Sequence, residues 1–216
     1  MERLRISKVK AALRSFGLLP FSDPTAPSLV SIVAGVLVSG SWWGHPAGQS
    51  IYAVGEALDS DPEVLVVKLW RGKLTLVHRR LWPALVRVGG SRAIWQMAGL
   101  SLDASRLLAR VEREGRVRSD SMLGDSPRSA QNLRPSLRSL EQRLLVLTRS
   151  VHTDTGAHAL EAESWGGWGA RMETPRFAGS AAAAQLSLEE ASRRLTPHVD
   201  PLRTLPWGRS RTTPGS

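Results

Sequence analysis

The stretch VVKLWRGKLTLVHRRLWPALV, which runs from Val66 to Val86, decides the expected fold of this chain. Two apolar runs, residues 64–69 and 74–77, flank a short turn at Arg71-Gly72, and this arrangement is typical of a β-hairpin. Cationic side chains lie at the turn and again at the exit of the second run. These charges have two interpretations: contacts with an anionic partner, or a solvated sheet edge that lysine protects from aggregation.

Three helical segments precede this hairpin. Apolar residues recur at helical spacing from Arg5 to Phe16, a second short segment runs from Ser28 to Val33, and a third begins after His45-Pro46. The order helix, helix, helix, strand, strand is the minimal plan of a winged helix, in which a β-hairpin wing follows a helix-turn-helix.

A second cycle of the same kind follows the hairpin. Ser101 and Gly115 are suited to cap the two ends of one helix, and residues 131–143 favour another. The runs 145–151 and 157–162 then flank a polar turn, as in a second hairpin. The sequence therefore predicts an α+β, helix-rich fold of tandem winged-helix modules with β-hairpin wings.

The element order also suggests where the domains lie. We expect the first winged-helix-like module at residues 1–90 and the second at residues 91–170. Residues 171–216 are expected to form an alanine-rich helix and a mobile proline-rich tail, because the segment after Leu195 contains four prolines and few core residues.

The chain is strongly basic. Its 216 residues include 29 Lys and Arg against 19 Asp and Glu, which gives a net charge of +10. Residues 151–216 carry 7 residues of each sign, so the whole excess lies in the first 150 residues, together with the first hairpin. This balance indicates an anionic partner.

Other bulk features narrow the class of protein. Cysteine is absent, which excludes disulfides and thiolate metal sites. The most apolar run, residues 29–38, is shorter than the ~20 residues that span a bilayer, and no signal peptide is visible. We expect a cytoplasmic bacterial protein, associated with the nucleoid, without a membrane partner.

Three phrases resemble a family of uncharacterised bacterial proteins, namely GSWWGHPAGQSIYAV (Gly40–Val54), KLWRGKLTLVHRRLWPALVRVG (Lys68–Gly89) and VHTDTGAHALEAESWGGW (Val151–Trp168). LLARVEREGRV, residues 107–117, is similar to the helix-and-turn opening of many winged-helix domains. The overall plan resembles the winged-helix proteins grouped around the AlkZ-type (YcaQ-like) DNA glycosylases, which repair crosslinked and alkylated bases. The resemblance implies a winged-helix fold, but the catalytic Gln-x-Gln pair of those enzymes is absent from this chain.

A winged-helix fold predicts which side chains contact DNA. A wing lays cations on phosphates, and the helix before it presents side chains to base edges and phosphates. We therefore expect double-stranded DNA as the partner, bound through Lys68, Arg71, Lys73, Arg79, Arg80, Arg134 and Arg138. The alternative is an ordinary solvated surface at both places, and Pro135 argues against a long unbroken reading helix.

Other clusters offer different chemistry. His152, Asp154 and His158 have donors for a metal ion, but a hairpin turn explains Asp154 more simply. Trp42 and Trp43 are either a stacking platform for bases or core residues, and core packing is favoured. The sequence has no Gly-x-Ser-x-Gly motif and no glycine-rich phosphate loop. Nothing compels an enzyme, and neither a metal nor another cofactor is expected.

Three hypotheses follow, in order of preference. The first is a DNA-binding protein that tolerates many sequences and has no catalysis of its own. The second is a glycosylase-like repair enzyme or its accessory, with Glu56, Asp154 and Glu161 as the nearest side chains for an extruded base. The third is a protein-interaction scaffold, because a fold does not fix a function.

Overall fold

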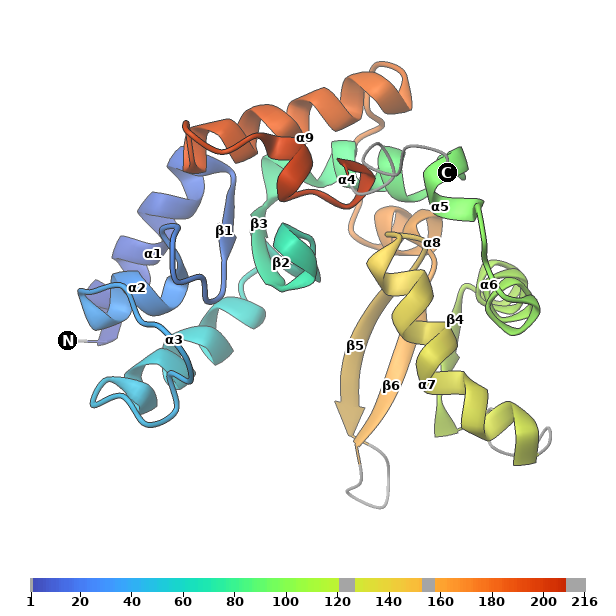
Figure 1. Ribbon diagram of the computed structural model, residues 1–216, viewed down its shortest axis with the longest axis horizontal. Helices are drawn as coiled ribbons and strands as arrows, with labels where there is room; N and C mark the ends of the chain where they lie inside the picture. Colours follow the sequence, from blue (N-terminus) through green and yellow to red (C-terminus); the bar gives the residue numbers. More distant parts are fainter. Residues whose placement is uncertain (1, 121–126, 153–157, 209–216) are drawn as a thin grey trace, which may run out of the picture. The chain divides into compact units, whose positions relative to one another are not determined.

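A computed structural model describes residues 2–120, 127–152 and 158–208 of the chain. The chain folds into two compact units. Unit 1 combines the residues up to Trp82 with those from Gln185 onward, and unit 2 runs from Pro83 to Ala184. Each unit contains helices and a three-stranded antiparallel sheet, which confirms the expected helix-rich α+β class (Figure 1).

Unit 1 begins with three helices and three strands, in the order α1 (Glu2–Phe16), β1 (Leu18–Pro20), α2 (Leu29–Ala34), α3 (Gly48–Asp59), β2 (Val64–Lys68) and β3 (Leu74–His78). Local signals set the ends of α2: Ser28 forms a capping box with Ser31, and Gly35 ends the helix at a positive φ of 79°. The three predicted helices and the predicted hairpin are therefore confirmed.

The sheet of unit 1 has the strand order β1-β3-β2. β2 and β3 pair from Val64–His78 to Lys68–Leu74. The sequence does not predict β1, because a three-residue strand that ends in Pro20 gives almost no periodic signal. β1 lies at the edge of the sheet, where the missing amide hydrogen of a proline is tolerated.

The core of this unit lies between the first three helices and the sheet. Helix α1 contacts α2, α3 and β1, and α3 contacts β2. Figure 1 shows the three helices gathered beside β1. Their apolar faces are buried, with Val9, Leu13, Leu29, Ile51, Val54 and Leu58 as the main contributors. Because the apolar face of α3 is buried in this core, its opposite face lies toward solvent.

From α4 (Trp82–Gly89) the chain continues through unit 2. The elements that come next are, in order, α5 (Ile94–Met97), α6 (Leu102–Glu114), β4 (Arg116–Arg118), α7 (Pro127–Gln142), β5 (Leu147–His152), β6 (His158–Glu163), α8 (Trp165–Arg171) and the start of α9 (Ala181–Leu195). Ser101 caps α6 by accepting a hydrogen bond from the Ala104 amide at 3.1 Å, and Gly115 follows its last residue, as predicted. Helix α7 begins before the predicted start and contains Pro135 in its interior.

The sheet of unit 2 repeats the arrangement of the first sheet. Its strand order is β4-β6-β5, so in both sheets the third strand in sequence lies between the first and the second. β5 and β6 pair from Leu147–Glu163 to His152–His158, which confirms the second predicted hairpin. Helices α6 and α7 pack on each other, and α7 contacts β5 (Figure 1). One apolar cluster joins them, made of Leu107, Leu108, Val111, Val117, Leu133, Leu137, Leu140, Val146 and Ala162 among others.

The sequence does not predict α8, because three of its seven residues are glycines, which disfavour helices. Ser164 starts the helix by capping the Gly167 amide. Packing also explains a glycine nearby: a side chain at Gly89 would overlap the buried Trp165 ring. Close approach of elements, and not local preference, therefore selects glycine at Gly89.

Residues 196–208, after α9, are folded and contribute to a core. This C-terminal segment forms two short 3-10 turns, η4 (Pro201–Arg203) and η5 (Pro206–Gly208), which belong to unit 1. Leu205 and Trp207 are buried, and the Trp207 indole donates to Glu189 of α9 at 2.8 Å. The expectation of few core residues after Leu195 is therefore wrong for residues 196–208. The prolines begin tight turns that bring these two apolar side chains inward.

Candidate nucleic-acid interface

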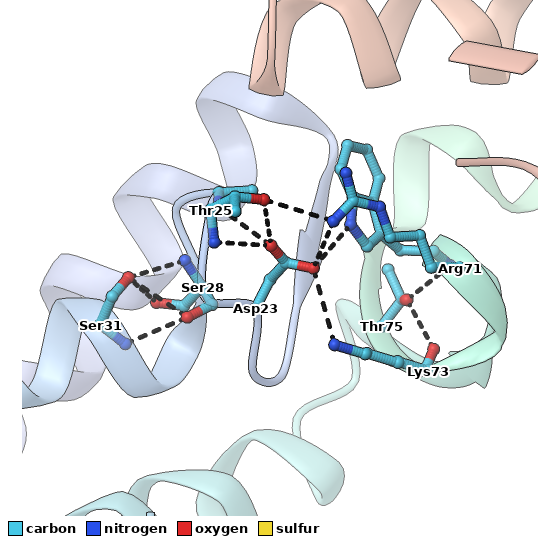
Figure 2. Close-up of polar contacts among 9 residues, drawn as sticks. Asp23, Thr25, Ser28, Ser31, Arg71, Lys73 and Thr75 are labelled. Carbon is cyan, nitrogen blue, oxygen red and sulfur yellow. Dashed lines mark hydrogen bonds and ion pairs between the residues drawn. The ribbon is translucent and has the colours of Figure 1, made fainter. Parts of the chain in front are cut away.

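The turn of the first hairpin is anchored on a buried carboxylate, Asp23 (Figure 2). Asp23 is only 1% exposed, and its Oδ1 accepts hydrogen bonds from the Thr25 amide, the Thr25 hydroxyl and the Ala26 amide at 2.9–3.1 Å. Its Oδ2 lies 3.3 Å from Arg71 Nη1 and 3.8 Å from Lys73 Nζ. The loop before α2 and the turn of the hairpin are thus joined through one side chain.

The surroundings of Asp23 keep it charged. Burial raises the pKa of the carboxyl, but the hydrogen bonds from Thr25 and the charges of Arg71 and Lys73 outweigh burial, so the pKa lies below its usual value. A buried carboxylate needs such partners, because leaving it unpaired costs several kcal/mol (about 3–5). Arg71 and Lys73, two of the predicted DNA contacts, therefore already neutralise a structural charge.

The C-terminal segment contacts the same turn. Arg71 has a positive φ of 50°, and its amide donates to the Thr204 carbonyl at 2.7 Å. Turn η5 contacts the hairpin turn η1 (Trp70–Gly72), in which Trp70 is fully buried. The Trp70 indole also donates to Asp23 at 3.3 Å. This turn is consequently packed within unit 1 on one side and is not an isolated wing tip.

The remaining predicted cations of the first hairpin differ in accessibility. Lys68 ends β2 and is half-buried, while Arg79 and Arg80 are exposed in the 3-10 turn η2 (Arg79–Leu81). Arg80 donates to the Ser15 carbonyl at 3.0 Å. Burial and the nearby charge of Arg194 lower the pKa of Arg80. Arg194, in the last turn of α9, therefore adds a third exposed arginine to this region.

Helix α7 presents the two predicted arginines of unit 2 to solvent. Arg134 and Arg138 are both exposed and lie one turn apart, since residues at i and i+4 share a helix face. Leu133, Leu137 and Leu140 are buried on the other side. Among the residues that the structure describes, neither arginine forms an ion pair. Their charges are available to a partner.

The second hairpin holds its charges differently. Arg149 and Glu161 form an ion pair across the strands, with Arg149 Nε 2.8 Å from Glu161 Oε1. Glu163 is buried between Arg116 and Arg171, at 3.0 Å and 2.8 Å. Burial raises the pKa of Glu163, but the hydrogen bonds from Arg171 and Arg116 prevail and lower it below its usual value. Both glutamates have structural partners, which leaves little reason to assign them catalysis.

Two further expectations concern metal and membrane binding. Asp154 lies outside the described residues, and so do the side chains of His152 and His158. Within residues 2–120, 127–152 and 158–208 there is no cluster of three or more His, Cys, Asp or Glu that would hold a metal ion. No helix in those same ranges is both long enough and apolar enough to cross a membrane.

Most of the tryptophans are buried, two (Trp42 and Trp95) are partly buried, and one is largely exposed. Trp70, Trp82, Trp165, Trp168 and Trp207 are buried, as core packing predicts. Trp43 is 66% exposed, so the expectation of core packing is wrong for this residue. Its ring stacks on Trp42 with centroids 4.2 Å apart.

The helices that precede the two hairpins carry opposite chemistry. Helix α7 exposes Arg134 and Arg138, whereas α3 has no Lys or Arg and exposes Glu56 and Asp59. A phosphate backbone is attracted to the first surface and repelled by the far end of the second. Of these two helices, α7 is the one whose exposed charge is complementary to phosphates.

Sequence reasoning missed Asp23 and Arg194. The Asp23-Pro24 step does carry a signal, because aspartate before such a turn accepts backbone hydrogen bonds from the following residues. Its contact with Arg71, 48 residues away, has no local signal. Arg194 lies close enough to influence Arg80 electrostatically only because its part of α9 belongs to unit 1, and the distance along the chain hides that proximity.

Comparison with known proteins gives no relative. No protein-family model matches the chain. No curated protein matches it, and no solved structure does. The function has therefore to be inferred from the residues themselves.

Proposed function

We propose that this chain is a tandem winged-helix protein that binds double-stranded DNA through phosphate contacts and performs no chemistry on it. The observation that carries the proposal is the exposed pair Arg134 and Arg138 on α7. They are one turn apart on a helix whose other face is anchored in an apolar core. A cationic stripe on a rigid helix is the geometry that follows a DNA backbone or groove.

The order of elements supports the winged-helix part of the proposal. In unit 1 a helix, a short strand, two helices and a hairpin follow one another, and the strand order is first, third, second. In unit 2, α6, β4, α7 and the β5–β6 hairpin follow one another with the same strand order, and among the described residues one helix stands where unit 1 has two. By this correspondence α7 is the helix that enters the groove and β5–β6 is the wing.

The charge distribution supports a second cationic surface, on unit 1. Arg79, Arg80 and Arg194 gather exposed positive charge in unit 1. Arg71 and Lys73 are partly offset by Asp23, so their contribution to DNA affinity is expected to be smaller. Lys68 remains a candidate contact at the end of β2.

A charge-reversal experiment tests the proposal. The double variant Arg134→Glu with Arg138→Glu is compared with the unmodified chain in fluorescence anisotropy on a labelled 20-base-pair duplex at low salt. Each lost phosphate contact weakens binding, and reversal adds repulsion, so we expect a loss of affinity of at least about tenfold.

The control carries the same change in net charge on a different helix of unit 2. Arg106 and Arg113 are exposed on α6, and their double reversal to glutamate should weaken binding much less. Equal losses in the two variants would show that net charge alone matters. Failure of the unmodified chain to bind the duplex at low salt would refute the proposal.

A further inference from the structure

We infer that unit 1 carries a stacking site for an unpaired nucleobase, formed by Trp43 and Tyr52 at the N-terminal end of α3. This inference rests on the proposed function, since it names the form of DNA that the chain distinguishes. The ring centroids of Trp43 and Tyr52 are 5.9 Å apart, and the two residues are 66% and 49% exposed. Large aromatic rings that are left in water at this level need a reason.

The ring of Trp43 is held in place before any partner arrives. It stacks on Trp42 with an interplanar angle of 23°, and Trp42 in turn contacts Phe21 at a centroid distance of 5.6 Å. The loop below them is fixed by hydrogen bonds from the His45 amide to the Trp42 carbonyl and from the Gly48 amide to the His45 carbonyl, at 3.1 Å and 2.7 Å. A preformed stack loses little conformational entropy when a flat partner adds to it.

Gly48 allows this loop to lie close to α3. A Cβ at that position would be 3.0 Å from the carbonyl oxygen of Trp43, which is tighter than ordinary contact. The tryptophan loop is thus seated on the first turn of α3, and Tyr52 follows one turn later. The exposed amide of Gln49, on the same turn, adds a hydrogen-bonding group suited to a base edge.

Arg5 lies at this end of α3, and the exposed carboxylates of α3 itself lie toward its other end. Helix α1 packs against α3, and the side chain of Arg5 donates a hydrogen bond to Ser50. Glu56 and Asp59 are in the last two turns of α3. A nucleic-acid strand would therefore place its phosphate near Arg5 and its base on Trp43, away from the carboxylates.

The surface suits an unpaired base better than a duplex. A base inside a duplex has both ring faces covered by its neighbours, so only an unpaired or extruded base can stack on a protein ring. Arg134 and Arg138 serve the duplex backbone, whereas Trp43 serves single-stranded segments. The two surfaces can thus be separated by mutation.

Binding to the single-stranded oligonucleotide (dT)12 and to a 12-base-pair duplex tests the inference. Stacking is worth ~1–3 kcal/mol per base, so Trp43→Ala should weaken binding of (dT)12 by about 5- to 150-fold and leave duplex affinity within about twofold. Trp43→Phe keeps a flat ring and should restore most of the affinity for (dT)12. Tyr52→Ala should weaken (dT)12 binding to a smaller extent.

Several outcomes would overturn the inference. Equal weakening on both nucleic acids, or no change on (dT)12, excludes a stacking site. A change in molecular mass by light scattering that depends on Trp43 would show that the rings form a contact between copies of the chain. Loss of duplex binding in the Arg134 and Arg138 variant has no bearing on Trp43, so each proposal can fail alone.

Discussion

Asp23 and Arg71 are joined by a hydrogen bond of 3.3 Å between Oδ2 and Nη1, although 48 residues separate them in sequence. This contact connects the loop before α2 to the turn of the first hairpin. The carboxylate is buried and the guanidinium is half-exposed. The hairpin turn is therefore positioned by the helical half of unit 1, and its cations have a structural role whether or not DNA is bound.

Replacement of Asp23 tests that role. Asp23→Ala removes the hydrogen bonds to Thr25, Ala26 and Trp70 together with the ion pairs, and leaves buried donors unsatisfied. We expect the free energy of unfolding to fall by about 2–3 kcal/mol, measured by urea denaturation. Asp59→Ala changes an exposed aspartate of the same unit and should alter stability by no more than about 0.5 kcal/mol. Similar values for the two variants would contradict a structural role for Asp23.

The sequence predicts the long periodic elements of this fold and misses those that depend on packing. The apolar spacing of α1 and α6 and the β-branched runs of β2 and β3 are local, so their positions follow from the chain itself. Strand β1 has three residues, and α8 is rich in glycine. Both form because neighbouring elements pair with them or cover them. Those neighbours lie outside any single window of sequence.

Trp207 provides a second test, on the C-terminal segment. Its ring is 3% exposed, and its indole nitrogen donates to Glu189. Trp207→Ala leaves a cavity and should lower the free energy of unfolding by about 3–5 kcal/mol. Trp43→Ala removes the same side chain from an exposed position and should change stability by less than about 1 kcal/mol. If both variants unfold at the same urea concentration, the segment after α9 contributes no core.

Glu163 predicts a pH dependence of stability. Its pKa in the folded chain lies below that in the unfolded chain, because Arg171 and Arg116 donate to the carboxylate. The unfolded chain then binds more protons as the pH falls below the usual glutamate value, so this contribution is present near pH 7 and is lost in acid. Glu163→Gln should be less stable than the unmodified chain at pH 7, and the difference should shrink toward pH 3. A constant difference across that range, in urea unfolding curves, would contradict the ion pairs.

As with the fold, the sequence predicts some features of the candidate site and misses others. Arg134 and Arg138 were expected on one helix face from their spacing, and the structure places both of them on the exposed face of α7. Arg71 and Lys73 look identical to free wing cations in the sequence, because Asp23 is distant and its loop carries no charge pattern that points to them. Long-range ion pairs decide which cations remain available to a partner. The spacing of neighbouring residues in the sequence does not reveal such pairs.

Salt dependence distinguishes arginines that are available from those that are already paired. Arg79 and Arg194 are exposed and form no ion pair among the described residues, whereas Arg110 pairs with Glu114 and Arg193 with Glu189. Each phosphate contact contributes about 0.9 to the slope of log affinity against log salt on duplex DNA. Arg79→Gln with Arg194→Gln should therefore reduce that slope by about 1–2.

The matched control is Arg110→Gln with Arg193→Gln, which removes the same charge from two paired positions. Its slope should change by less than about 0.5, because those guanidiniums would have to leave a carboxylate before they release a counterion from DNA. Titrations of a labelled duplex between about 50 and 200 mM salt measure both slopes. If the two double variants lower the slope equally, the region around Arg80 contributes only to overall charge, and α7 alone makes the directed contact.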